Sequence, residues 1–133
     1  MNLGNKDLDN IEKWISLIHK KAKEDPKIQG MIWYGSSLES DFFRDIDIAL
    51  FGSPNLSSQE LFQLRIEYLK DIPDFFDIQI FNLLPVAVQH EVLKGKVIFV
   101  ENFAYELAYR SIQEFEDFEK YLEQYRDAYL NVN

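Results

Sequence analysis

Cysteine is missing from this chain, and histidine is nearly missing. Without cysteine, the 133 residues can form neither a disulfide nor a thiolate zinc site. The two histidines, His19 and His90, are too few for a histidine-based metal site. Metal chemistry that depends on sulfur or on several imidazoles is therefore excluded.

Long apolar runs and clusters of positive charge are also scarce. No apolar run approaches the length that spans a bilayer, and residues 1–7 lack the charged and apolar regions of a signal peptide, so we expect a cytoplasmic protein without membrane contact. The net charge is −9, and the one short basic run, Lys20–Lys23, is typical of the solvated end of a helix. Because nucleic-acid binders usually carry a basic face, we expect no direct nucleic-acid binding and favour a basic partner.

Hydrophobic and aromatic residues, in contrast, are plentiful enough for one core. They make up 47% of a chain with 23 acidic and 14 basic residues, and the length predicts a single domain over residues 1–133. Apolar periodicity, caps and turn residues predict alternating helices and strands, hence an α/β (α+β) fold. We expect a small mixed sheet with helices on one face and carboxylates on the other, open face. The first predicted helix ends near Lys23, and the later helices cover 57–70, 85–93 and 103–130. The predicted strands cover 28–34, 45–51, 75–81 and 97–100.

The long last helix carries an apolar stripe whose members alternate three and four residues apart. Two interpretations of this stripe stay open. It packs on its own domain, or part of it contacts a partner subunit, because aromatic residues are favoured in interface cores. The stripe consists of Phe115, Phe118, Leu122, Tyr125 and Tyr129.

Three carboxylates stand inside apolar strands. Asp45 and Asp47 are two residues apart, so in a strand both would point to the same face. Buried charge is costly unless it is paired or bound to metal, and Mg²⁺ prefers such oxygen ligands. Asp77 lies in a second apolar run, on a neighbouring strand, where two roles are open to it: ligand of a second metal ion, or base for an incoming hydroxyl.

A small polar turn, Gly35-Ser36, precedes the carboxylate pair by eight residues. Glycine lets a phosphate approach the backbone, and the free N–H groups at a following helix start favour anions. A second interpretation needs no ligand, because Ser36-Ser37-Leu38-Glu39 also fits a capping box. The turn and the carboxylates together favour metal-dependent nucleotidyl transfer.

The combination Gly35-Ser36, Asp45-x-Asp47 and Asp77 resembles the motif of minimal nucleotidyltransferases in the DNA polymerase β superfamily. More narrowly, the segment Leu93–Phe99 and the C-terminal stretch resemble the antitoxins that pair with HEPN ribonuclease toxins. The resemblance implies Mg²⁺-dependent transfer of AMP from ATP to a tyrosine of the toxin. It also implies that Asp45, Asp47 and Asp77 bind metal and that Gly35 and Ser36 hold the triphosphate.

The spacer between the turn and the pair departs from that family. It carries Glu39 and Asp41, which would repel triphosphate, and Arg44 at a position where a small residue is usual. Arg44 is either a phosphate contact or a charge partner of Asp45.

Three functions are compatible with these features. The first is the protein adenylyltransferase that the resemblance implies. The second is an antitoxin that neutralises its toxin by binding alone, which the acidic spacer favours. The third is nucleotide transfer to a small molecule, for which 133 residues leave little room. Retention of all three carboxylates favours the enzyme; the oligomeric state, homomeric or heteromeric, stays open.

Overall fold

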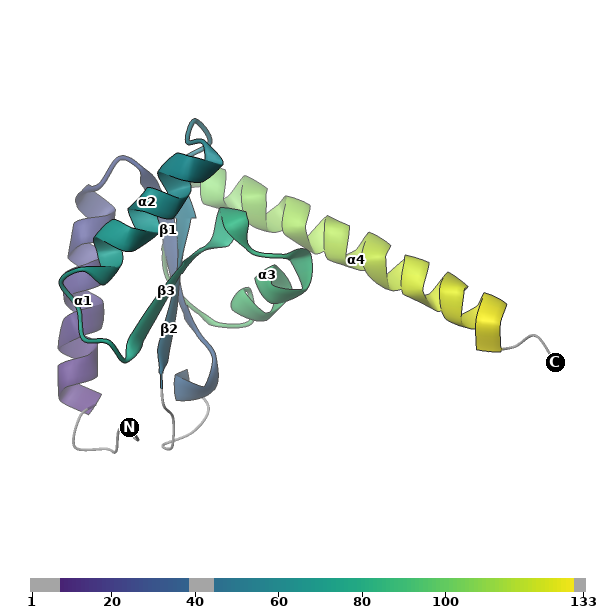
Figure 1. Cartoon of the computed structure of the whole chain (residues 1–133), viewed down its shortest axis with the longest axis horizontal. Helices are drawn as coiled ribbons and strands as arrows, with labels where there is room; N and C mark the ends of the chain where they lie inside the picture. The colour runs from purple at the N-terminus through teal and green to yellow at the C-terminus, as the bar shows by residue number, and fades with distance from the viewer. Residues whose placement is uncertain (1–7, 39–44, 131–133) are drawn as a thin grey trace.

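A computed structural model describes residues 8–38 and 45–130 of the chain (Figure 1). Within these residues, helices and strands follow each other in nearly the predicted order, and the boundaries agree to within about two residues. The helix expected after Gly35 is a single 3-10 turn. The elements are α1 (Leu8–Glu24), β1 (Ile28–Tyr34), η2 (Ser36–Leu38), β2 (Ile46–Gly52), α2 (Ser58–Leu69), β3 (Phe76–Ile80), η3 (Phe81–Leu83), α3 (Val86–Val92), β4 (Lys96–Val100) and α4 (Asn102–Leu130).

Four strands form one mixed sheet in the order β3-β2-β1-β4. The central strand β1 is antiparallel to both β2 and β4, whereas β3 runs parallel to β2 along the edge of the sheet. A parallel pair needs a crossover connection, and α2 supplies it between β2 and β3. The α/β fold class predicted from the sequence is confirmed.

The first face of the sheet is covered by α1 and α2. Ile11, Ile15 and Ile18 recur at helical spacing and bury the inner side of α1. They pack against alternate strand residues such as Ile48 and Ile78, which are fully buried. The start of α2 is fixed by a complete capping box between Ser57 and Glu60, at the place where the sequence predicts that a helix begins.

The second face is partly covered as well, which corrects the expectation that helices lie on one face alone. Ile32, Phe51 and Phe81 form a separate apolar cluster there with Val92 of α3 and Ala104 of α4. The carboxylates lie on this same face of the sheet, toward the start of β2. The reason is strand alternation: odd-numbered positions of β2 and β3 point to this face. In β2 they change from Asp47 to Ala49 and Phe51, and in β3 they are the polar Asp77 and Gln79.

The last helix extends beyond the rest of the protein. Its first turns contact α3 and β1, and the remainder projects away from the sheet (Figure 1). From Glu116 to Ala128 every residue is exposed. The base of the helix therefore packs on its own domain, and for the exposed remainder contact with a partner subunit stays a prediction.

Candidate active site

Asp47 and Asp77 lie directly beside each other on the second face of the sheet. In the parallel register of β2 and β3 they are partners, and on the other side Asp47 is the partner of Tyr34 in β1. A row of three polar side chains thus crosses three adjacent strands. The sequence predicted the pairing of a carboxylate on each strand, and the register confirms that the two are neighbours.

The charge on Asp47 is destabilised where it lies. Burial first, and then the neighbouring carboxylates of Asp77 and Asp45, raise the pKa of Asp47 from 3.8 to about 6. Asp45 itself is exposed at the residue before β2. Burial together with neighbouring carboxylates produces this kind of shift. A cation bound here would relieve the repulsion.

Gly35 stands against the same carboxylate. Its φ of +87° is a conformation that L side chains rarely adopt, and a Cβ added to it would collide with Oδ2 of Asp47. We expected glycine here to make room for a phosphate; the described contact shows that glycine first makes room for Asp47. The turn and the carboxylate pair are therefore one structural unit.

The turn that follows Gly35 leaves one of its two serines exposed. The Ser37 hydroxyl accepts a hydrogen bond from the indole nitrogen of Trp33 at 2.7 Å, while Ser36 is exposed. Glu39, the expected partner of Ser36 in a capping box, lies outside the described residues, as do Asp41 and Arg44. The roles predicted for Arg44 stay predictions.

Asp77 has two partners that the sequence did not indicate. Nη2 of Arg65 lies 3.3 Å from its Oδ1, and Nε2 of Gln79 donates to both carboxylate oxygens at 3.2 and 3.1 Å. Arg65 is itself fixed, because its Nε donates to the carbonyl of Ile78 at 2.6 Å. Gln79 could have been found from its i+2 spacing to Asp77. No local signal connects Arg65 of α2 to Asp77.

Tyr34 completes the row as a neutral group. Burial, followed by the charges of Asp47 and Asp77, raises its pKa to about 12. The phenol thus keeps its proton at neutral pH and is suited to donate a hydrogen bond rather than to act as a nucleophile.

The carboxylate oxygens at this site are the type of ligand that a magnesium ion prefers. Among the described residues no group of three or more His, Cys, Asp or Glu side chains is placed to hold a metal ion. Asp77 is already hydrogen-bonded by Arg65 and Gln79, whereas no such partner is described for Asp47. Mg²⁺ commonly binds through one or two carboxylates together with substrate phosphates, so this donor set is compatible with it.

The shifted Asp47 gives a testable pH dependence. Because its pKa is raised by folding, the metal-free protein should lose free energy of unfolding as pH rises from about 4 to about 6, and then stay level. After allowance for partial exposure, the loss should be about 1 kcal/mol. Asp47→Asn should remove this step, so the variant should be the more stable protein at pH 7.5 in a chelator. Urea unfolding of both proteins at pH 4, 5, 6 and 7.5 measures it, and a stability difference that is independent of pH would contradict it.

Comparison of the sequence with known protein families finds a match. The sequence pattern of the family described as "Polymerase beta, Nucleotidyltransferase" matches residues 16–104, about two thirds of the chain. The chain belongs to this family. The match begins inside α1 and ends in the first turn of α4, so it includes the row of three polar residues and leaves out the projecting part of α4.

Several solved structures with a similar fold contain a toxin–antitoxin pair. One contains a tri-AMPylated HEPN toxin of Shewanella oneidensis with its MNT antitoxin: TM-score 0.56, 20% identity, covering 90% of this chain and 92% of that one. Another is a toxin–antitoxin with AMP-PNP: TM-score 0.59, 21% identity, covering 90% and 95%. A third is the toxin–antitoxin MntA–HepT: TM-score 0.55, 19% identity, covering 89% and 93%. No curated protein matches the chain.

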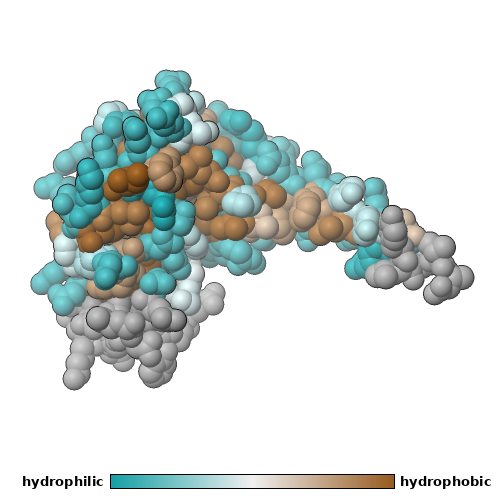
Figure 2. Space-filling view, in the orientation of Figure 1, coloured by the Kyte–Doolittle hydropathy of each residue, from teal (hydrophilic) through white to brown (hydrophobic). Residues whose placement is uncertain are grey.

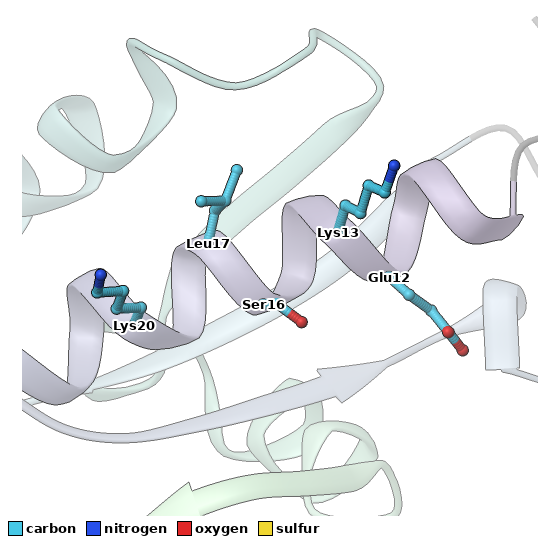
Figure 3. Close-up of a pocket in the computed structure, with 5 residues that line it drawn as sticks. All are labelled: Glu12, Lys13, Ser16, Leu17 and Lys20. Carbon is cyan, nitrogen blue, oxygen red and sulfur yellow. The ribbon is translucent and has the colours of Figure 1, made fainter.

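A hollow elsewhere on this nucleotidyltransferase carries no comparable chemistry. It runs along the outer side of α1, and Figure 3 shows that one helix supplies its lining: Glu12, Lys13, Ser16, Leu17 and Lys20. Since α1 covers the first face of the sheet, this hollow is on the opposite side from Asp47 and Asp77.

None of the described helices combines the length and the apolar character needed to cross a membrane.

Proposed function

We propose that this chain transfers AMP from ATP to a protein hydroxyl and acts as an antitoxin whose acceptor is a tyrosine of a HEPN-type ribonuclease. The observation that carries the proposal is the direct pairing of Asp47 with Asp77 across β2 and β3, against the Gly35 turn. The family membership supports nucleotidyl transfer. The toxin–antitoxin complexes of the same fold support the acceptor.

The proposed roles follow from where the side chains lie. Asp45 and Asp47 would hold Mg²⁺, and the exposed turn at Gly35 and Ser36 would receive the triphosphate, joined by Arg44. When bound, Mg²⁺ neutralises charge on the triphosphate and on the departing pyrophosphate. Asp77 would complete the metal site or take the proton of the attacking hydroxyl.

The reaction balances with these groups. The phenolic oxygen of the acceptor forms a bond to the α-phosphorus of ATP, and the bond from that phosphorus to the bridging oxygen of pyrophosphate breaks. The proton of the phenol passes to a base, for which Asp77 is the candidate. Positioning and charge neutralisation then supply most of the catalysis. We place the protein in the cytoplasm, where ATP and such a toxin would be available.

Two observations favour a second function, neutralisation by binding alone. Asp77 is already engaged by Arg65 and Gln79, and the described residues include no preformed group of three metal-binding side chains. In that case the nucleotide site would be a remnant, and the toxin would be blocked by occlusion.

One experiment separates the two functions. The protein is incubated with ATP, Mg²⁺ and a purified HEPN-type ribonuclease, and the intact mass and activity of the ribonuclease are measured. We expect the mass of one or more AMP groups on tyrosine and loss of ribonuclease activity. Asp45→Asn serves as the matched control and should leave the toxin unmodified. Inhibition without added mass, equal in the control, would overturn the enzymatic proposal and establish the binding module.

A further inference from the structure

The base of α4 is fastened to the rest of the protein by specific contacts. The Ser111 hydroxyl donates to Oε1 of Gln89 at 2.8 Å, and Nε2 of Gln89 donates to the carbonyl of Phe81 at 2.9 Å. One turn later the ring of Phe115 stacks on His90 of α3, with ring centroids 3.7 Å apart. Ser111 and Gln89 are buried, so these contacts fix the direction in which the helix leaves the domain.

Beyond Phe115 the helix continues as an exposed arm, residues 116–128. Figure 1 shows it projecting from the sheet, and Figure 2 shows apolar surface continuing along it. A helix of this length is marginal in water without tertiary packing. Phe118, Tyr121 and Leu122 are nevertheless 43%, 60% and 46% exposed on it. Both facts indicate a surface that is covered in the working protein.

The apolar face of the arm is the same face that α4 buries against its own domain. Ser111, Phe115, Phe118 and Leu122 follow one another at spacings of four, three and four residues, which places them on one side of the helix. We name Phe118 and Leu122 the seam. Spacing of three and four is the pattern by which a helix packs along another helix. The seam is therefore suited to pack against a helix of a partner protein, next to α3.

The charge around the seam identifies the chemistry of that partner. From Ile112 to Ala128 the helix has six acidic and two basic residues. Glu114 and Glu119 lie on either side of the seam. If a partner helix packed along the seam, the residues beside its apolar positions would come close to these two glutamates. A second copy of this chain would bring like charges together there, on proteins that each carry a net charge of −9. A partner helix with lysine or arginine beside its apolar residues fits instead.

We propose that the arm docks along a helix of the HEPN-type toxin that carries lysine or arginine beside its apolar residues, with Phe118 and Leu122 as the apolar anchors of the arm. This inference rests on the proposed function for the identity of the partner. Because α3 and the base of α4 cover the second face of the sheet, the docked partner lies on the same side as Asp47 and Asp77. The arm would therefore place the acceptor on the side of the domain that carries the carboxylates, and not on the opposite side.

Two double variants of the full chain test the arm. Phe118→Asp with Leu122→Asp changes the seam, whereas Tyr105→Asp with Tyr109→Asp changes two exposed residues of α4 outside it, which are 64% and 62% exposed. Both variants add two negative charges, so they are matched. Binding to the purified HEPN-type ribonuclease is measured by calorimetry, and helix content by circular dichroism.

We expect the seam variant to bind the ribonuclease about 30-fold more weakly or worse. The control variant should stay within about twofold of the original chain. Both should bind AMP-PNP like the original chain, because the nucleotide site is remote from the arm. Equal losses in the two variants, or none in the seam variant, would overturn the docking proposal.

The remaining outcomes separate this proposal from the proposed function. If the original chain modifies the ribonuclease and the seam variant does so with an unchanged KM for it, the docking proposal fails and the proposed function stands. If the original chain neither binds nor modifies the ribonuclease, both fail. If light scattering shows a dimer that the seam variant alone abolishes, a second copy covers the seam and the docking proposal is overturned.

Discussion

Replacing Asp45 and Asp47 together with asparagine is expected to abolish Mg²⁺ binding and to lower AMP transfer by at least about 10³-fold. Asparagine keeps the size of each side chain and removes the negative charge that a hard cation requires. The fold should survive, because Asp45 is exposed and Asp47 carries a charge that its surroundings disfavour. Without metal, the melting temperature should stay level or rise.

Calorimetric titration with Mg²⁺ and with Mn²⁺ measures the first effect, and mass spectrometry of the acceptor measures the second. A matched control removes two charges from α1 on the opposite side of the sheet, Glu12→Gln with Glu24→Gln, and should bind metal normally. Unchanged metal binding in the aspartate double variant would remove the site hypothesis. A large fall in its melting temperature would mean that the pair has a structural role.

The second large effect is expected for Asp77→Asn. Turnover should fall by about 10²–10³-fold while the KM for ATP stays within a few-fold, if Asp77 acts on the attacking hydroxyl. The asparagine oxygen can still accept from Arg65, so the side chain should keep its orientation. The variant therefore tests the charge of Asp77 and disturbs its position little.

Steady-state kinetics with varied ATP separate the two roles of Asp77. Equal losses in turnover and in ATP affinity would make it a metal or nucleotide ligand instead of a base. Asp74→Asn is the control, because Asp74 is exposed in the turn before β3 and lacks a place in the row with Asp47. Full activity of Asp77→Asn combined with loss in Asp74→Asn would show that the wrong carboxylate has been chosen.

The sequence by itself determined the elements and the kind of site. Strong local signals, such as the capping box at Ser57 and the helical spacing of Ile11, Ile15 and Ile18, fixed the helices. Alternation within the strands placed Asp45-x-Asp47 and Asp77 among apolar residues, which is why their side chains were expected on one sheet face. Local backbone preferences and side-chain periodicity need no knowledge of distant segments.

The tertiary structure alone decided how those parts meet. The strand order puts β3 at the edge, so Arg65 of α2 can reach Asp77 on the second face; neither residue predicts the other from sequence. Packing also decided that α3 and the base of α4 cover part of the carboxylate face, and that the apolar stripe of α4 divides at Phe115 into a packed base and an exposed arm. The physical reason is that the stripe has the same periodicity throughout, and only the extent of the domain beneath it determines where burial ends.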